Sequence, residues 1–406
     1  MLLEGRELVL AVTGSVAAYK AAYLLRELRR LGATVAVVMT EHAREFVAPL
    51  TFRTLSGRPV LSNLFDPQEP TAVEHIDLAE RTDLVMVAPA TANALTRAAL
   101  GLADDFLGTL LLATRAPILF APAMDGEMWR HAAVQGHVAT LRARGATVME
   151  PEQGELASGL IGPGRFPHVD DIVETVARLV WPKRDLTADH VLVTAGPTRE
   201  PIDPVRYLSN RSSGRMGYAV ATLAARRGAQ VTLVTGPTSL RPPIGVRVIP
   251  VQTAEEMREA VLQAVVASTI VIKAAAVGDY RVAYPASGKI RSKHDGLTMT
   301  FVPSPDILQE LGRTKAGRFL VGFAAETADV HASALAKLET KGVDLMIAND
   351  VSRTDIGFDA EDNEVVMLDR WGGVVELQRL PKLAVADAIL DRVQTLRRAT
   401  LAARTP

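Results

Sequence analysis

About twenty residues between an apolar strand and a helix hold an unusual concentration of prolines, arginines and small polar residues. The segment Thr194–Gly217 reads TAGPTREPIDPVRYLSNRSSGRMG. A loop of this length inside a compact domain is usually either functional or disordered. Its SSGRMG turn abuts a helix N-terminus, where backbone N–H groups, the helix dipole and arginines can converge on an anion. The residues therefore favour a phosphate-binding loop over a solvated surface loop.

A second set of small hydrogen-bonding residues follows three apolar strands in the first half of the chain. Ligands of open α/β sheets bind beyond the carboxyl ends of strands, so these residues could hold a phosphate and a ribityl chain without cationic side chains. No G-x-G-x-x-G sequence accompanies them, which disfavours a dinucleotide. The set comprises Thr13, Gly14, Ser15, Thr40, Thr91 and Asn93.

Both halves of the chain alternate apolar strands with helices, and this pattern predicts parallel sheets covered on both faces. The fold class expected is α/β, with two doubly wound, Rossmann-like three-layer domains. The proline- and charge-rich segment 181–190 marks a linker, giving domains 1–183 and 184–406. Strands are expected at 8–14, 34–40, 83–91, 117–124, 146–151, 190–196, 230–236, 246–251, 269–277, 318–326 and 344–349; helices at 17–32, 93–101, 128–145, 217–228 and 381–404; and a hairpin at 363–380.

The overall composition excludes several classes of protein. The formal net charge of −1 provides no general attraction to nucleic acid or anionic membranes. No apolar run is long enough to span a bilayer, and the N-terminus leads directly into a strand instead of a signal peptide. A soluble, cytoplasmic protein is expected. The absence of cysteine excludes disulfides, thiolate metal sites and cysteine nucleophiles.

The string at 194–217 resembles the signature loop of bacterial phosphopantothenate–cysteine ligases, the CTP-dependent half of a bifunctional coenzyme A biosynthesis enzyme. KAAAVGDYR (273–281), SGKIRSK (287–293), SPDIL (304–308) and GFAAET (322–327) follow in the family's order, with Gly278 where alanine is usual.

The resemblance implies that Asn210 acts on an acyl-cytidylate, that Asp279 contacts nucleotide or magnesium, and that Lys289 covers the nucleotide. It also implies nucleotide-binding positions at Ala275, Pro305, Asp306, Ile307, Leu308, Phe323, Lys337 and Lys341, and substrate-binding positions at Arg206, Ser212 and Gly214. The sequence offers no His/Cys cluster with metal-ligand spacing, so Mg²⁺ held largely by phosphates is expected.

Residues 6–180 resemble the flavin-dependent phosphopantothenoylcysteine decarboxylases. The matching stretches include GSVAAYK, VEHIDLAERTDLVMVAPATAN, GLADD and GLIGPGR. The resemblance implies FMN as cofactor and His75 as the active-site histidine, although a lone histidine can also be only a polar residue starting a helix. It further implies cofactor-binding positions at Gly14, Ser15, Thr40, Ala90, Thr91, Asn93 and Met124, and a substrate-binding position at Arg165.

Two positions depart from that family's pattern. Asp125 stands where an asparagine is expected to hold the substrate carboxylate, and Ser158 stands where a cysteine often donates a proton in the final reduction. A serine hydroxyl is a much weaker acid than a thiol, whose pKa is near 8.5. One hypothesis is that water or Asp125 supplies the proton instead. The other is that this half decarboxylates but releases the unsaturated thiol.

Together the two resemblances imply a bifunctional enzyme. The C-terminal domain would ligate 4′-phosphopantothenate to L-cysteine with CTP, and the N-terminal domain would decarboxylate the product with FMN. They also imply a homo-oligomer, a dodecamer built from trimeric and dimeric contacts. Two alternatives remain: an active ligase whose flavin domain only serves assembly, and a nucleotide-binding regulatory protein without turnover.

Overall fold

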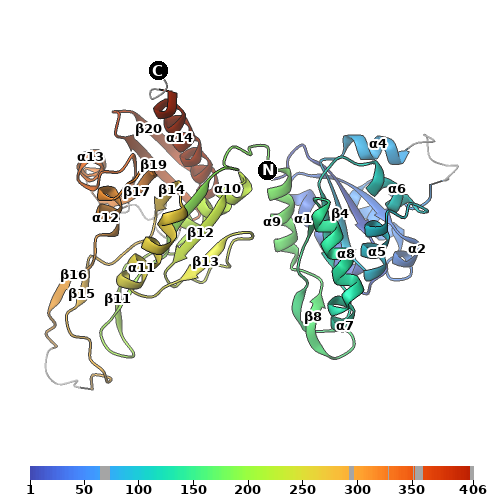
Figure 1. Cartoon of the computed structure of the whole chain (residues 1–406), viewed down its shortest axis with the longest axis horizontal. Helices are drawn as coiled ribbons and strands as arrows, with labels where there is room; N and C mark the ends of the chain where they lie inside the picture. Colours follow the sequence, from blue (N-terminus) through green and yellow to red (C-terminus); the bar gives the residue numbers. More distant parts are fainter. Residues whose placement is uncertain (65–73, 292–296, 328, 351, 353–359, 403–406) are drawn as a thin grey trace. The chain divides into compact units, whose positions relative to one another are not determined.

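The computed structural model describes residues 1–64, 74–291, 297–327, 329–350, 352 and 360–402. The chain divides into two compact units, Met1–Trp181 and Pro182–Pro406 (Figure 1). Each unit is built on one large sheet whose strands are separated by helices. The α/β class with mostly parallel sheets is thus confirmed.

The first unit contains a six-stranded, fully parallel sheet in the order β3-β2-β1-β4-β5-β6. Its strands are β1 (Glu7–Val12), β2 (Thr34–Met39), β3 (Val60–Leu61), β4 (Leu84–Ala90), β5 (Ile118–Pro122) and β6 (Thr147–Val148). Its helices are α1 (Ala18–Arg30), α2 (Glu41–Arg44), α3 (Pro49–Ser56), α4 (Glu74–Arg81), α5 (Ala92–Leu100), α6 (Phe106–Ala113), α7 (Gly126–Arg130), α8 (Ala132–Ala143) and α9 (Val169–Val180).

Both faces of this sheet are buried, because successive side chains of a strand point to opposite sides. Leu8 and Leu10 of β1 pack in one core with residues of α1, α3 and α9. Val9 and Ala11 pack in a second core with residues of α4, α5, α6 and α8. The unit therefore has three layers, and the carboxyl ends of its parallel strands share one edge.

Two local features of this unit differ from the sequence expectation. The helix expected over 128–145 is interrupted at His131, whose extended backbone and ring nitrogen cap the new helix α8 through Ala133 N. A hairpin formed by β7 (Glu152–Glu155) and β8 (Ile161–Arg165) was not expected from the sequence.

The second unit contains an eight-stranded sheet in the order β13-β12-β9-β14-β17-β18-β19-β20. Pairing is parallel from β13 to β18, and β19 and β20 add an antiparallel hairpin at one edge. The strands are β9 (His190–Ala195), β12 (Gln230–Thr235), β13 (Arg247–Pro250), β14 (Ile270–Lys273), β17 (Phe319–Glu326), β18 (Leu345–Asp350), β19 (Asp362–Asp369) and β20 (Val374–Pro381).

The helices of this unit are α10 (Arg215–Arg226), α11 (Ala254–Ala264), the short 3₁₀ helix η1 (Val265–Ala267), α12 (Ile307–Arg313), α13 (Val330–Lys341) and α14 (Lys382–Ala402). Two small hairpins project from the sheet (Figure 1): β10 (Arg199–Pro201) with β11 (Tyr207–Ser209), and β15 (Tyr280–Val282) with β16 (Phe301–Pro303). The long loop expected after residue 196 therefore contains an antiparallel ribbon.

A buried arginine anchors the beginning of this unit to its last helix. Arg227 is completely buried and pairs with Asp185 at 2.6 Å, with Asp387 at 3.1 Å and with Asp391 at 2.8 Å. Lys183 pairs with the same two α14 carboxylates. The segment that follows the boundary between the units is thereby fixed against α14.

Candidate functional site

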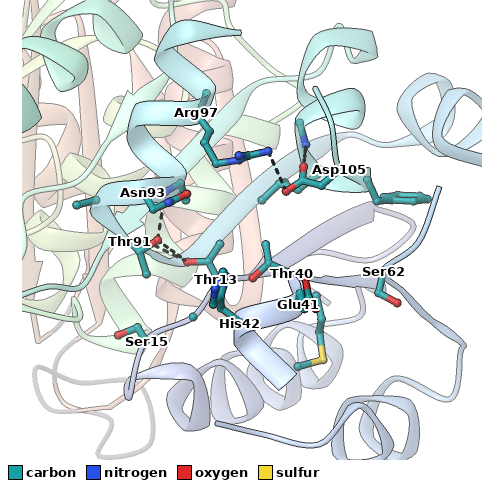
Figure 2. A pocket seen from close by; sticks show the side chains of 18 of the residues that line it. Thr13, Ser15, Thr40, Glu41, His42, Ser62, Thr91, Asn93, Arg97 and Asp105 are labelled. Carbon is teal, nitrogen blue, oxygen red and sulfur yellow. Dashed lines mark hydrogen bonds and ion pairs between the residues drawn. The ribbon is translucent and has the colours of Figure 1, made fainter. Parts of the chain in front are cut away.

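A cavity of about 870 Å³ opens at the carboxyl ends of the first unit's strands (Figure 2). Its size suits a cofactor or another small molecule. The structure places six of the seven residues expected to bind a cofactor in its wall. They are Gly14, Ser15, Thr40, Thr91, Asn93 and Met124.

Two threonines join the ends of β1 and β4 at this cavity (Figure 2). Thr13 donates its hydroxyl hydrogen to Pro89 O at 2.7 Å and accepts from Thr91 N at 3.2 Å. Thr91 in turn caps α5, because its Oγ1 accepts from Ala94 N at 3.2 Å. These bonds fix the small polar side chains at the strand ends.

Thr40 carries an unsatisfied hydroxyl in the same cavity. Its Oγ1 is buried and has no hydrogen-bond partner among the described residues. A buried polar atom without a partner is costly, so a ligand with a polar group is the expected partner. Arg97, a cationic side chain in the wall, is engaged by Asp104 and Asp105. The neutral hydroxyl and amide groups therefore fit a phosphate and a polyol chain such as those of a flavin nucleotide.

Five of the predicted residues lie outside the wall: Ala90, His75, Arg165, Asp125 and Ser158. Ala90 is buried in β4, where its carbonyl accepts from Ala123 N. His75, on α4, packs edge-on against the Phe106 ring with centroids 6.3 Å apart, and Phe106 itself lines the cavity. Arg165 is exposed at the end of β8, opposite Glu152.

The two positions that depart from the decarboxylase pattern contact each other. Ser158 donates a hydrogen bond of 2.6 Å to Asp125 Oδ2, while Asp125 Oδ1 accepts from Glu127 N and caps α7. The Ser158 bond, followed by the Glu127 bond, holds the pKa of Asp125 below its ordinary value. Asp125 is therefore a carboxylate at neutral pH. Met124 N donates to Gly164 O, which holds β8 against this turn.

In the second unit, the loop after β9 is joined to the segment that follows β14. Thr198 N donates to Ala276 O, and Thr198 Oγ1 accepts from Gly278 N at 3.0 Å. Asn210 Nδ2 donates to Val277 O at 3.0 Å. Residues 67 to 80 positions apart in the sequence thus form one surface at the carboxyl edge of the sheet.

Two glycines allow helix α10 to begin against β9. Gly214, the N-cap, has a φ of +77°, and a Cβ there would lie 2.7 Å from Thr238 Cγ2. A Cβ on Gly217 would lie 2.6 Å from Ala195 Cβ. Only glycine tolerates these positions without a shift. Ser212 Oγ accepts from Gly214 N at 3.4 Å, so the SSGRMG turn does meet a helix N-terminus.

Arg206 is held by a buried carboxylate. It pairs with Asp203 at 2.6 Å and donates to Ile290 O at 2.7 Å. Burial raises the pKa of Asp203, but hydrogen bonds from Val205 N, Arg206 and Ile290 N outweigh this and hold it well below the ordinary value. The exposed Lys289 is thereby kept next to the loop.

The segment after β14 presents Ala275 and Asp279. Ala275 N donates to Thr194 Oγ1 at 3.1 Å. The Asp279 side chain is exposed and forms no hydrogen bond or ion pair with any described residue, whereas its carbonyl accepts from Ser304 N. An open carboxylate at a strand end is suited to a cation or to hydroxyl groups.

Three side chains of the Pro305–Leu308 turn are already engaged within the protein. Ile307 and Leu308 are buried in the core, and Asp306 caps α12 and pairs with Lys341. Burial raises the pKa of Asp306, but Lys341 and the cap bond more than offset this and lower it. Of the other expected nucleotide contacts, Lys337 pairs with Glu326 at 2.7 Å, and Phe323 is partly buried in β17.

Sequence reasoning assigned no role to Thr198 or Asp203, whose hydrogen bonds join the 194–217 loop to neighbouring segments. Both residues lie inside the 194–217 loop. Asp203 is followed by Pro204, and an Asp-Pro sequence indicates a turn, so the turn at Asp203 could have been predicted.

Among the described ranges, no three His, Cys, Asp or Glu side chains form a metal site. No helix within those ranges is both long and apolar enough to cross a bilayer.

Comparison with known proteins identifies both units. Residues 2–181 match the family described as Flavoprotein, and residues 186–396 match the family described as DNA/pantothenate metabolism flavoprotein C-terminal domain. Among solved structures, the C-terminal domain of a coenzyme A biosynthesis bifunctional protein CoaBC is 40% identical, with a TM-score of 0.47. The match covers 53% of this chain and 100% of the solved domain.

Full-length relatives have the same arrangement. The coenzyme A biosynthesis bifunctional protein CoaBC of Vibrio vulnificus (strain YJ016) is 45% identical over 97% of this chain and 98% of its own length. The CoaBC proteins of Bacillus subtilis (strain 168) and Escherichia coli (strain K12) are each 44% identical, over 98% and 97% of this chain and 99% and 98% of their own lengths. The chain therefore belongs to the family of bifunctional coenzyme A biosynthesis proteins, with a flavoprotein domain followed by a pantothenate-metabolism domain.

Proposed function

We propose that the Pro182–Pro406 unit joins 4′-phosphopantothenate to L-cysteine, with conversion of CTP to CMP and pyrophosphate through an acyl-cytidylate. The observation that carries this proposal is the 3.0 Å bond from Asn210 Nδ2 to Val277 O, which brings the 194–217 loop to the end of β14. The amide nitrogen has a second hydrogen. That hydrogen is available for the oxyanion that develops when the activated acyl group is attacked.

Asp279 and Lys289 are proposed to serve the nucleotide. The open Asp279 carboxylate would hold Mg²⁺ together with the phosphates, since this ion is usually bound by one or two carboxylates and substrate phosphates. Lys289, exposed beside the loop, would cover the triphosphate. Because Lys337 and Lys341 already have carboxylate partners, their proposed contact with nucleotide would require exchange of those partners.

We propose that the Met1–Trp181 unit binds FMN in its cavity and decarboxylates the product of the ligase to 4′-phosphopantetheine. A flavin held there would supply the reversible two-electron chemistry that decarboxylation of a thiol-bearing substrate requires. Ser15, Thr40 and Thr91 would hold the phosphate and ribityl groups. His75, next to Phe106, would transfer a proton during the reaction.

A coupled assay tests both halves with the full chain. The purified protein is supplied with 4′-phosphopantothenate, L-cysteine, CTP and Mg²⁺, and the products are identified by mass spectrometry. Pyrophosphate release that requires both CTP and the acid supports the ligase. Carbon dioxide release together with a bound yellow chromophore supports the decarboxylase, and rejects the idea that the flavin unit serves assembly alone. No pyrophosphate release under any condition would leave only a nucleotide-binding role.

A second candidate outcome for the flavin unit is release of the unsaturated thiol. The ionised Asp125 and the weakly acidic Ser158 favour it, because neither readily donates a proton at neutral pH. The electrons kept by the flavin would then pass to an external acceptor such as dioxygen. The same assay separates the outcomes, since the unsaturated product is lighter by two hydrogen atoms.

We propose further that the protein acts in the cytoplasm on small molecules, without a nucleic-acid or membrane partner, as a homo-oligomer. The resemblance implies a dodecamer. Mass photometry of the purified chain tests this assembly, and a monomer at assay concentration would contradict it.

A further inference from the structure

Lys273 is the last residue of strand β14, two residues before Ala275, which is expected to bind the nucleotide. In the parallel register its Cα lies beside Thr194 of β9 and Gly322 of β17. Because side chains alternate along a strand, Lys273 lies on the same face as Val271, which packs in the core beneath α12. Its position therefore directs the lysine to the carboxyl edge of the sheet, where α12 begins.

Two other lysines near this edge already have carboxylate partners. Lys341 pairs with Asp306, and Lys337 pairs with Glu326. By contrast, the Lys273 ammonium forms no hydrogen bond or ion pair within the described part of the chain. The Lys273 ammonium at this edge therefore has no polar partner among the described residues and is available to a ligand.

Burial and neighbouring charges give Lys273 an unusual environment. Burial lowers its pKa to about 8; Asp306 and Asp279 act to raise the pKa, and Lys341 acts to lower it. A partly buried ammonium without a direct partner is unfavourable for folding. A ligand with negative charge would remove that cost.

A second unsatisfied group belongs to the same edge. Ser304 Oγ is buried and has no hydrogen-bond partner among the described residues, while Ser304 N donates to Asp279 O. Ser304 precedes the Pro305–Leu308 turn expected to meet the nucleotide. An unpaired cation and an unpaired hydroxyl flanking the same turn are complementary to an anion with several oxygen atoms.

We propose that Lys273 and Ser304 are contacts for the phosphate groups of the nucleoside triphosphate, in addition to the positions that the resemblance indicates. This inference rests on the proposed ligase function. The Lys273 ammonium donates charge-assisted hydrogen bonds to phosphate oxygens, and the Ser304 hydroxyl donates another. The lysine therefore contributes to binding of the triphosphate and not to recognition of the base.

Calorimetric titration of the full chain tests the proposal, with Mg²⁺ present and without acid or cysteine. CTP, CMP and cytidine are compared, the last by competition. Lys273→Met removes the charge but keeps most of the side-chain volume, and Lys273→Arg keeps the charge. Lys183→Met serves as the control, because Lys183 pairs with Asp387 and Asp391 on α14.

Lys273→Met is expected to weaken CTP binding by roughly 10- to 100-fold, as for loss of a hydrogen bond to a charged group, and to leave cytidine binding unchanged. Lys273→Arg should recover part of the affinity, and Lys183→Met should match the wild type. CTP affinity within twofold of the wild type, or an equal loss for CTP and cytidine, would overturn the inference. If Lys273→Met fails to fold, the same comparison is made with Ser304→Ala. A wild-type chain that binds no CTP would instead reject the proposed function.

Discussion

Ser158 donates its hydroxyl hydrogen to Asp125, at 2.6 Å. The two residues that depart from the decarboxylase pattern therefore form one hydrogen-bonded pair. The pair keeps the carboxyl group ionised and occupies the serine hydrogen. We therefore expect this pair to affect proton transfer in the last step of the flavin reaction.

Restoring the decarboxylase pattern at both positions is expected to increase the share of saturated product. The double variant Asp125→Asn/Ser158→Cys introduces a thiol, which releases a proton far more readily than a hydroxyl. Product masses from the decarboxylase half measure the ratio of saturated to unsaturated thiol. Glu127→Gln, on the same short helix, is the control. An unchanged ratio in the double variant would mean that another donor, such as water, already completes the reduction.

Ser158→Ala alone is expected to raise the pKa of Asp125. The Ser158 bond is the largest influence that lowers it, and only the Glu127 backbone bond and Arg130 would remain as lowering influences. Because the pKa in the parent is depressed, the carboxylate is present at neutral pH and is protonated only in acid. NMR titration of the Asp125 carboxyl carbon in both proteins measures the change. A downward or absent shift would show that the bond is not formed in solution.

Asn210→Ala is expected to slow ligation by about 100-fold, the usual effect of losing one oxyanion donor. The substitution also removes the bond to Val277 O. CTP-dependent pyrophosphate release gives the rate. Asn93→Ala, in the wall of the flavin cavity, should leave ligation unchanged. Equal rates for Asn210→Ala and the parent would contradict the role assigned to this amide.

Thr40→Val is expected to weaken FMN binding without lowering the stability of the flavin-free protein. Its hydroxyl has no partner among the described residues, so folding loses no hydrogen bond. One neutral hydrogen bond to the ligand corresponds to about 1 kcal/mol, or roughly fivefold in affinity. Thr91→Val is the contrasting variant, because Thr91 caps α5, and it should lower the unfolding midpoint as well. Unchanged FMN affinity in Thr40→Val would exclude this contact.

Gly214→Ala is expected to destabilise the second unit by roughly 1–2 kcal/mol through backbone strain at its positive φ. Contact of the new methyl group with Thr238 adds to this. Gly288→Ala is the control, since its Cβ would meet nothing within 4 Å and its φ is not in the left-handed region. Urea unfolding of both variants gives the free energies. Equal stability of the two would indicate that the turn relaxes freely.

Arg227→Met is expected to lower the free energy of unfolding by about 3 kcal/mol, because it removes the buried cation that pairs with Asp185, Asp387 and Asp391. Burial raises the pKa of Asp185, but bonds from Arg227 outweigh it and lower the pKa. The stabilisation is therefore present at neutral pH and is lost as the pH falls below about 4. Urea unfolding at pH 7 and in acid measures both effects. Arg379→Met, at an exposed pair with Asp362, should cost under about 1 kcal/mol.

The sequence predicted the large sheets well, because parallel strands buried on both faces are continuous apolar runs. The strands expected at 34–40 and 230–236 are β2 and β12, shorter by one residue each. The β7–β8 hairpin was missed, since EQGE and IGPGR contain neither alternation nor β-branched residues apart from Ile161. Its pairing depends on backbone geometry, with both Gly154 and Gly164 at positive φ.

The positions of the residues in the candidate sites could be predicted from the sequence, but the contacts between them could not. Strand-end positions such as Thr40 and Thr91 could be read from the sequence because a sheet edge collects the ends of parallel strands. The ion pairs of Lys337 and Lys341 could not, because their partners lie 11 and 35 residues away. The contact between Ser158 and Asp125, 33 residues apart, likewise depends on how β8 folds back.

The bonds that join Thr198 and Asn210 to the segment after β14 should affect the rate at which the nucleotide binds. A loop that is ordered before its ligand arrives loses little conformational freedom on association. Capture of the nucleotide then depends on diffusion and electrostatic attraction, and its rate should fall as ionic strength rises. We therefore expect the proline-rich segment to act as a rigid receptor, in which recognition requires no folding step.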